Sequence, residues 1–298
     1  MKIYAIVVAY NGMQWYERCL GSLRDSGMPV ETIVVDNASI DETVTYIKEH
    51  FPNVILIESK KNIGFAKANN IGIKRALDSG ADYVFLLNQD AWIEKDTLTK
   101  LVQTFNENEN VGIVSPIHLN GLYTGLDWGF LHYVSDEFIS DSYMHKLKKS
   151  YQLDFVNAAA WLVSAECIRK VGGFDTLLFQ HYGEDDNYCQ RVKYHGFKIL
   201  LNTQCTICHD RQERYRENEN TYRQQYFSQE YKTLKVHLGN INHVEDMDKR
   251  IRMYYLYMLK SILCLNINKL RRQKKEFQLL KQIKQSRQIN KTTGAHWL

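Results

Sequence analysis

The sequence predicts an α/β fold: a mostly parallel sheet flanked by helices, followed by a helical extension towards the C-terminal end. Three observations carry this prediction. Short apolar runs alternate with amphipathic stretches through the first half of the chain, as in strands joined by crossover helices. Polar residues stand directly after several apolar runs, as at the ligand-binding edge of such sheets. From about residue 224 onward the pattern is helical and rich in lysine and arginine.

Apolar runs of strand length predict the strands in order. The first run is too short for a signal peptide and no small-residue cleavage site follows it, so we interpret it as a buried first strand. The predicted strands cover Ile3–Ala9, Glu31–Asp36, Val54–Glu58, Tyr83–Leu87, Val111–Val114 and Lys198–Leu201, and the apolar pattern also resumes over 155–163.

Helices are predicted between these strands, where apolar residues recur at helical spacing. Ser39-Ile40-Asp41-Glu42 matches a capping box and is expected to open a helix that ends near His50. Residues 116–150 are rich in Gly, Tyr and His, and are expected to form an irregular excursion or a hairpin over the ligand-binding edge. The other predicted helices cover Trp15–Asp25, Ala66–Ser79, Asp96–Asn108, Glu166–Val171 and Asp185–Tyr194.

The six cysteines are expected to be reduced thiols, because no export signal accompanies them. Cys205-Thr206-Ile207-Cys208-His209 matches the haem attachment pattern C-x-x-C-H. We do not favour haem, since that attachment normally follows export. We do not favour structural zinc either, since no second Cys/His pair lies at finger spacing.

Charge is distributed unevenly along the chain. Residues 251–291 contain eleven Lys and Arg against the single acid Glu276, a net charge of about +10, which leaves the rest near −6. Basic helical tails attract anionic surfaces. A nucleic-acid partner is not expected, because no recognition motif accompanies the charge. Peripheral membrane contact, a helical hairpin packed on the domain and a homodimer contact all stay open.

A membrane-spanning helix is not expected. The longest late apolar stretch, Tyr254–Ile267, is interrupted by Lys260 and is too short to cross a bilayer. We therefore expect a cytoplasmic protein, peripheral at the inner face of the cell membrane if the basic tail contacts lipid.

Two acidic sites carry the chemistry. Glu184-Asp185-Asp186 places three carboxylates in a row, and a core would not select them because they repel one another. Asn88-Gln89-Asp90 ends an apolar strand much earlier in the chain. One site suits a general base and the other a metal ion. Together they indicate group transfer from a phosphorylated donor.

Six motifs in a fixed order identify a family resemblance: Val8-Ala9-Tyr10-Asn11, Val34-Val35-Asp36-Asn37-Ala38-Ser39, Asn62-Ile63-Gly64-Phe65-Ala66-Lys67-Ala68-Asn69-Asn70, Leu86-Leu87-Asn88-Gln89-Asp90, Gly172-Gly173-Phe174-Asp175 and Tyr182-Gly183-Glu184-Asp185. In these the chain resembles family 2 glycosyltransferases of the GT-A fold, of the rhamnosyltransferase-like kind, over roughly residues 1–215. The resemblance implies an inverting enzyme that uses a nucleotide-diphosphate sugar. It divides the chain into a nucleotide-binding half at about 1–115, an acceptor half at about 116–215 and the basic extension at 216–298.

The resemblance implies a set of nucleotide contacts at the strand ends. Asp36 can accept a hydrogen bond from a ribose hydroxyl or a pyrimidine N–H, a turn-forming Asp being the alternative. Gly64 lets the backbone approach the ligand, and Lys67 is either a phosphate contact or a surface lysine. The implied nucleotide-binding residues are Ala9, Tyr10, Asn11, Asp36, Asn62, Gly64, Lys67 and Asn69.

The metal site and the base follow from the same resemblance. Asn88-Gln89-Asp90 occupies the position of the D-x-D metal motif with its first Asp replaced, which leaves Asp90 as the implied ligand of Mg or Mn. His209 is the implied second ligand, a structural histidine being the alternative. Metal-independent activity also stays open.

Asp185 maps onto the base that removes the acceptor proton. Its neighbours raise its proton affinity, whereas the start of a helix opposes that effect. Asp186 is interpreted as a helix-starting residue. The residues expected beside the donor sugar or acceptor are Asn88, Gln89, Trp161 and Glu184, with a core position as the alternative for Trp161.

The predicted function is transfer of a sugar from dTDP-rhamnose or a UDP-hexose to a saccharide acceptor, lipid-linked, in bacterial surface polysaccharide synthesis. A sugar nucleotidyltransferase is one alternative, but it needs a basic phosphate loop where Tyr10-Asn11-Gly12-Met13-Gln14 stands. A non-catalytic glycan-binding or scaffold protein is the other, motivated by Asn88 in place of Asp.

Overall fold

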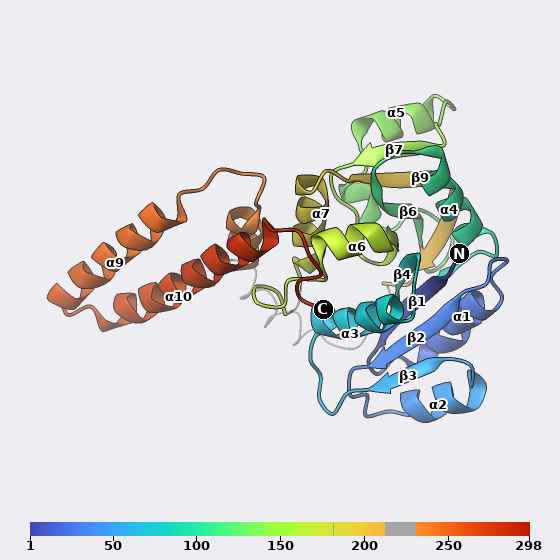
Figure 1. Ribbon diagram of the computed structural model, residues 1–298, viewed down its shortest axis with the longest axis horizontal. Coiled ribbons are helices and arrows are strands. Elements are labelled where there is room, and N and C mark those ends of the chain that lie inside the picture. Colours follow the sequence, from blue (N-terminus) through green and yellow to red (C-terminus); the bar gives the residue numbers. More distant parts are fainter. Residues whose placement is uncertain (181, 212–230) are drawn as a thin grey trace.

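The fold is described by a computed structural model that covers residues 1–180, 182–211 and 231–298. Over this part of the chain, nine strands form one sheet in the order β3-β2-β1-β4-β8-β6-β9-β5, with β7 paired to β9 (Figure 1). The strands are β1 Ile3–Ala9, β2 Glu31–Asp36, β3 Ile55–Glu58, β4 Tyr83–Asn88, β5 Ala91–Ile93, β6 Val111–Asn120, β7 Ser150–Leu153, β8 Ala160–Ser164 and β9 Lys198–His209.

Helices cover both faces of the sheet. Successive side chains of a strand point to opposite faces, so apolar residues are buried on both sides. Ile6 of β1 packs into the core beneath α3, α6 and α7, whereas its neighbour Val7 packs beneath α1 and α4. The helices are α1 Met13–Arg24, α2 Thr43–His50, α3 Phe65–Asp78, α4 Thr97–Glu107, α5 Asp136–Tyr143, α6 Ala165–Val171, α7 Glu184–Tyr194, α9 Met247–Leu263 and α10 Ile267–Asn290. Residues 231–239 are also helical.

The predicted parallel sheet is confirmed for the first four strands of the chain. β3, β2, β1 and β4 pair in parallel, so their carboxyl ends meet at one edge. The second half is mixed, since β8 runs antiparallel to both β4 and β6. The short strands β5 and β7 were not predicted, because three or four residues show no readable periodicity.

Two local predictions were wrong. Ser39 does not cap a helix: its N–H donates to the Asp36 carboxylate and its Oγ accepts from the N–H of Asn11, so α2 begins only at Thr43. The 116–150 segment is also more regular than expected. It contains the end of β6, a 3₁₀ turn and α5, whose first turn is capped by the Ser135 hydroxyl.

The turn at 172–175 joins several elements at a buried point. Arg191 of α7 is fully buried, and its guanidinium donates to the carbonyls of Val171 and Gly173 at 2.9 and 2.6 Å. Asn70 of α3 bonds both the N–H and the C=O of Phe174 at 2.8 Å. Asp175 accepts from Asn290 at the end of α10. This turn therefore fixes α3, α6, α7 and α10 to one another.

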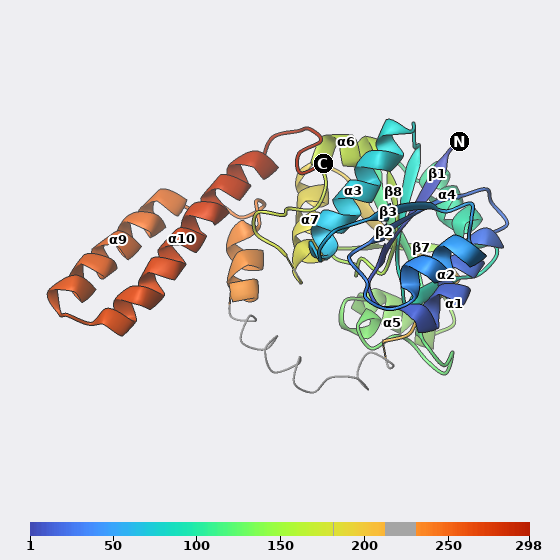
Figure 2. The same cartoon turned by 90° about the horizontal axis from the view of Figure 1, so that it is seen from below.

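The C-terminal extension is a hairpin of α9 and α10 that projects away from the α/β domain (Figures 1 and 2). Its base is held by an apolar cluster in which Phe179 meets Leu280 and Ile283 of α10. None of the helices in the described ranges combines the length and apolarity of a bilayer span. The predicted domain boundary at 215/216, and the predicted start of the helical pattern near residue 224, lie outside the described residues.

The six cysteines are unpaired, as expected of thiols; five are buried and Cys264, beside the turn between α9 and α10, is exposed. Cys205 and Cys208 lie buried on β9, a position that offers no access for haem attachment.

We predict that Asn70→Ala destabilises the fold. The buried Asn70 amide also donates to the Trp297 carbonyl at 2.9 Å, so truncation leaves several buried backbone groups without partners. We expect a loss of about 2–4 kcal/mol in the free energy of unfolding, measured by urea denaturation. The exposed Asn53 provides a control, Asn53→Ala, which should stay within about 0.5 kcal/mol. Equal losses in the two variants would contradict this role for Asn70.

Candidate active site

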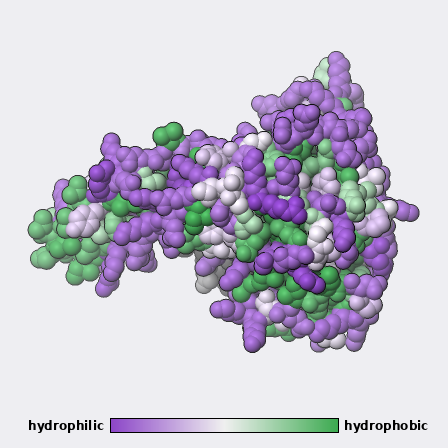
Figure 3. All heavy atoms as spheres, in the orientation of Figure 1, coloured by the Kyte–Doolittle hydropathy of each residue, from purple (hydrophilic) through white to green (hydrophobic). Residues whose placement is uncertain are grey.

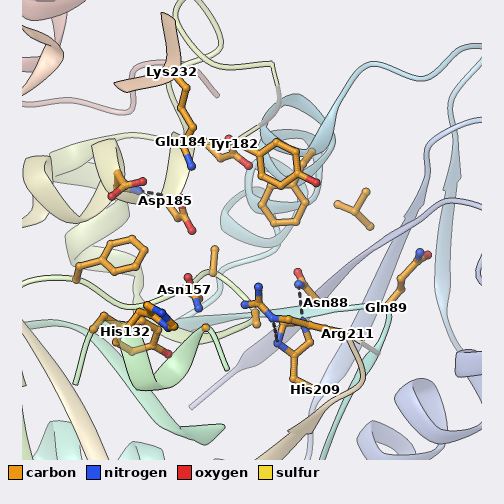
Figure 4. Close-up of a pocket in the computed structure, with 18 of the residues that line it drawn as sticks. Asn88, Gln89, His132, Asn157, Tyr182, Glu184, Asp185, His209, Arg211 and Lys232 are labelled. Carbon is orange, nitrogen blue, oxygen red and sulfur yellow. Dashed lines mark hydrogen bonds between the residues drawn. The ribbon is translucent and has the colours of Figure 1, made fainter. Parts of the chain in front are cut away.

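A pocket of about 620 Å³ opens at the carboxyl ends of β1 and β4 (Figure 4). Its volume lies in the range typical of small-ligand sites. The loops after β1, β2, β3 and β4 supply one wall, and the start of α7 with Lys232 supplies the opposite wall. The floor of the pocket is bounded by the 128–133 turn, the 155–159 segment and the end of β9.

Asn37 joins the loops that follow β1, β2 and β3 at the pocket wall. Its N–H donates to the Ala9 carbonyl at 2.7 Å after β1. Its side-chain oxygen accepts from the N–H of Ile63 at 2.7 Å, and its side-chain nitrogen donates to Asn62 Oδ1 at 3.0 Å. Hydrogen bonds within the protein therefore hold these loops together at the pocket wall. Asn37 lines the pocket and was missed as a site residue, although it stands inside a quoted motif.

The predicted nucleotide contacts divide into two groups. Tyr10 and Asn62 line the pocket. Asn11 and Asp36 instead brace the loops: Asn11 Oδ1 accepts from the N–H of Ile40 at 2.9 Å, and the buried Asp36 carboxylate accepts from the N–H groups of Ala38 and Ser39. The Asp36 carboxylate therefore has the turn-forming role that the sequence left as the alternative.

The remaining nucleotide candidates lie beside the pocket. Ala9 and Asn69 are buried, and the Asn69 amide donates to the Phe65 carbonyl within α3. Gly64 and Lys67 line a neighbouring cavity of about 360 Å³, which they share with Asn62. Gly64 has a φ of 85°, a left-handed conformation that favours glycine, and this turn starts α3.

Gln89 lines the pocket, but its amide is already engaged. Its Oε1 accepts from the N–H of Tyr10 and from the Tyr16 hydroxyl, both at 2.8 Å, and its Nε2 donates to the Tyr10 carbonyl at 3.1 Å. A Cβ at Gly12 would lie 2.6 Å from this Oε1, so a larger residue there would displace the Gln89 amide. Gln89 thus fixes the backbone of Tyr10 at the pocket wall.

The predicted metal ligands lie together. His209 Nε2 is 3.6 Å from Asp90 Oδ1 and 3.4 Å from Asn88 Nδ2. His209 and Asn88 line the pocket, and Asp90 is buried behind them. Ligand atoms bound to one ion at about 2.0–2.2 Å and at right angles lie about 3 Å apart. The Asp90–His209 pair therefore fits a single divalent ion after a small adjustment.

A second histidine–carboxylate group lies deeper and was not predicted. His118, Asp127 and His209 have ligand atoms within 4.8 Å of one another. Arg211 already pairs with Asp127, its Nε lying 2.9 Å from Oδ2. Burial, together with the nearby His209 and Arg211, lowers the pKa of His118 well below its usual value.

The three consecutive carboxylates start α7 at the pocket wall opposite His209 (Figure 4). Tyr182 and Gly183 both adopt positive φ, 64° and 93°, and this turn presents the acids. Glu184, Asp185 and Asp186 all line the pocket, so Asp186 faces the pocket as well as starting the helix.

Burial dominates the proton affinity of these acids. It raises the pKa of Glu184 to about 8 and that of Asp186 to about 6, with the Asp185 charge adding to both. Burial also raises the pKa of Asp185. The nearby Lys232 ammonium, which also lines the pocket, opposes all three shifts. The helix start does not outweigh burial at this site.

Trp161 is a core residue, so its predicted contact with sugar was wrong. It is fully buried on β8, and its ring stacks on Phe174 with a centroid separation of 6.1 Å. The exposed tryptophan that lines the pocket is instead Trp128, whose ring lies 4.0 Å from that of His132. The sequence prediction missed the pocket residues Trp128, His132, Asn157, Arg211 and Lys232. They stand outside the six motifs, so no spacing signal marked them.

This sheet topology, with helices on both faces, is that of the GT-A class of α/β proteins. Solved structures share the fold: GalNAc-T7 with UDP, GalNAc and Mn²⁺ (TM-score 0.59, 16% identity, 70% of this chain and 44% of that chain), and the mannosyltransferase PcManGT from Pyrobaculum calidifontis with GDP-Man and Mn²⁺ (0.54, 19%, 84% and 64%). S. aureus TarS 1–349 aligns over 98% of this chain and 89% of its own, at a TM-score of 0.54 and 15% identity.

The chain belongs to glycosyl transferase family 2, whose family model matches residues 4–172. It is 27% identical over 207 residues to the dTDP-rhamnosyl transferase RfbF of Shigella flexneri, covering 67% of this chain and 66% of the relative. It is 26% identical over 191 residues to the low-salt glycan biosynthesis hexosyltransferase Agl10 of Haloferax volcanii, covering 59% and 57%. The matches thus span no more than about two thirds of these relatives. The predicted family and GT-A fold are confirmed, and a named rhamnosyl transferase is among the relatives.

We predict that Glu184→Gln makes the fold more stable at alkaline pH. Because the native-state pKa of Glu184 is raised from 4.5 to about 8, the native state holds a proton that the unfolded chain releases within this window. The free energy of unfolding therefore falls as pH rises from 4.5 to 8. We expect the variant to melt at a higher temperature than the parent at pH 8 and at nearly the same temperature at pH 4.5, measured by calorimetry.

The exposed Glu109 supplies the matched control, Glu109→Gln, for which we expect no pH-dependent difference. A Glu184→Gln effect of the same size at both pH values would show that the carboxyl titrates normally in the native state.

Proposed function

We propose that this chain is an inverting glycosyltransferase that moves a sugar from a nucleotide-diphosphate donor to a saccharide acceptor. One observation carries the proposal: Asp185 and the Asn88–His209 pair line the same pocket from opposite walls. Inversion requires a base on one side of the reacting carbon and a leaving group on the other. The pocket offers an acid cluster on one side and a strand-end polar pair on the other.

In this reaction the acceptor hydroxyl oxygen forms a bond to the anomeric carbon while the bond from that carbon to the diphosphate oxygen breaks. Asp185 accepts the hydroxyl proton as the attack proceeds. Burial raises the pKa of Asp185, which makes its carboxylate a stronger base than an exposed one. The Lys232 ammonium opposes this effect, because it lowers the pKa of Asp185.

The donor in this proposal is dTDP-rhamnose or a UDP-hexose. The relative named as a dTDP-rhamnosyl transferase supports the first choice, and fold neighbours solved with UDP, UDP-GlcNAc or GDP-Man support a nucleotide-sugar donor in general. We propose a saccharide acceptor that is lipid-linked, in bacterial surface polysaccharide synthesis at the cytoplasmic face of the membrane.

The nucleotide occupies the side of the pocket bounded by Tyr10, Asn37 and Asn62 in this proposal. Their loops are already tied together, so little ordering is needed on binding. Asp90 and His209 would hold Mg²⁺ or Mn²⁺, which supplies positive charge to the departing diphosphate. Because Asn88 replaces a carboxylate, activity without metal is the alternative.

We predict that Asp185→Asn folds normally and loses sugar transfer by about 10²–10⁴-fold, because the amide cannot accept the proton. The measurement is release of nucleoside diphosphate from a panel of radiolabelled nucleotide sugars. Asp154→Asn, at a site whose side chain is 89% exposed, should retain parental activity. Near-parental turnover by Asp185→Asn would refute the assignment of the base.

The same assay separates the rival functions. Release of pyrophosphate instead of nucleoside diphosphate would indicate a sugar nucleotidyltransferase. Nucleotide-sugar binding without any release would indicate a glycan-binding or scaffold protein, the alternative motivated by Asn88.

We predict that Asp90→Asn and His209→Ala each remove the effect of Mn²⁺ on nucleotide binding. For the parent chain, dTDP or UDP should raise the melting temperature more with Mn²⁺ than with EDTA, since the ion binds ligand and protein together. Thermal-shift measurement tests this, with His50→Ala at an exposed position as the control. A Mn²⁺ effect that survives both site variants would place the ion elsewhere, and no Mn²⁺ effect in the parent would favour metal-independent binding.

A further inference from the structure

The outer half of the α9–α10 hairpin has its polar and apolar side chains reversed. Ser261 and Gln273 are buried between the two helices, and the Ser261 hydroxyl donates to Gln273 Oε1 at 2.7 Å. Large apolar side chains point outward instead. We call this exposed set the apolar tip: Leu256, Leu259, Ile262, Leu263, Leu265 and Ile267. In Figure 3 the apolar tip forms a hydrophobic area at the end of the hairpin far from the α/β domain.

This arrangement is the opposite of a helical hairpin that is stable in water, whose apolar stripe faces its partner helix. The exposed fractions of the tip residues run from 40% at Leu259 to 86% at Leu265. Scattered exposed leucines are common, but contiguous apolar patches mark contact surfaces. The apolar tip therefore indicates a partner.

The backbone conformation of Leu265, in the apolar tip, is also unusual for leucine. The turn after α9 closes with bonds from Leu265 N to Ile262 O and from Asn266 N to Ser261 O, both 3.0 Å. This is the Schellman pattern, whose left-handed residue is usually glycine or asparagine. Here that residue is leucine, with a φ of 52°, a conformation that is unfavourable for a side chain with a Cβ. Both the left-handed backbone conformation and the exposure to water disfavour leucine at this position. This indicates that the Leu265 side chain contacts a partner outside the hairpin.

The charge around the apolar tip selects the chemistry of that partner. Lys260, Lys269, Arg271, Lys274 and Lys275 are exposed near the tip, and no acidic residue occurs between Asp248 and Glu276. A second copy of this chain would bring the same positive hairpin and repel it. An anionic lipid surface offers an apolar interior and negative headgroups together, which matches both parts of the tip.

We propose that the apolar tip inserts into the interfacial region of an anionic membrane, while the surrounding Lys and Arg side chains contact lipid phosphates. The hairpin lies on the surface and does not cross it. This inference does not depend on the catalytic assignment, because the apolar tip shares no residue with the pocket.

Leu265→Gly tests the proposal without endangering the fold, since glycine suits the left-handed turn. We expect an equal or higher melting temperature and about tenfold or greater loss of affinity for phosphatidylglycerol-containing vesicles, because a buried leucine side chain is removed from the lipid. The full chain is used in co-sedimentation with vesicles of phosphatidylcholine alone or mixed with phosphatidylglycerol. The parent should bind the mixed vesicles more strongly, and added salt should weaken that binding.

Leu122→Gly is the matched control, since Leu122 is 68% exposed on the α/β domain. This variant should bind vesicles as the parent does. Lys274→Glu with Lys275→Glu should reduce binding to the mixed vesicles alone. Parental binding by Leu265→Gly, or equal binding of the parent to both vesicle types, would overturn the proposal. A dimer in light scattering that Leu265→Gly disperses, with no vesicle binding by the parent, would assign the apolar tip to a second copy and overturn it as well.

Discussion

The buried turn at 172–175 is the constraint on which the rest of the molecule depends. A fully buried arginine is costly unless it is hydrogen-bonded. Each guanidinium nitrogen of Arg191 donates a hydrogen bond, to the Asn187 side chain and to the carbonyls of Val171 and Gly173. Because Arg191 belongs to α7, these bonds set where α7 begins. They therefore position the carboxylates at the pocket. Asp175 attaches α10 to the same turn through Asn290, so the acidic wall of the pocket and the helical hairpin share one anchor.

The pocket combines a wall held by neutral hydrogen bonds with a wall of buried charge. On the nucleotide side, Asn37 and Gln89 use amides to tie neighbouring loops. On the other side, burial keeps the pKa values of Glu184 and Asp186 high, which lowers the stability of the fold near neutral pH. Such local cost is characteristic of functional sites, where the protein holds groups that a stable core would avoid.

Much of the nucleotide-binding half could be predicted from the sequence, because strand ends and motif order are local signals. The functions of single side chains could not. Asp36 was predicted to contact the ligand, but its carboxylate accepts hydrogen bonds from backbone N–H groups of its own turn. Trp161 was predicted to contact the sugar, but both faces of β8 are buried and its side chain lies in the core. Lys232 reaches the acids from a helix that no motif marks. The exposed apolar tip depends on which faces of α9 and α10 pack together. The spacing of apolar residues within a single helix does not reveal that choice.

Cys264 ends α9 next to Leu265 and is exposed, whereas the five other cysteines are buried. The native protein therefore offers a thiol-directed dye a selective attachment point at the end of the hairpin. An environment-sensitive fluorophore placed there would report the polarity around the α9–α10 turn directly. Its emission would blue-shift in hydrocarbon and stay unchanged in buffer, and quenchers at known depths in the acyl chains would give the immersion of the turn.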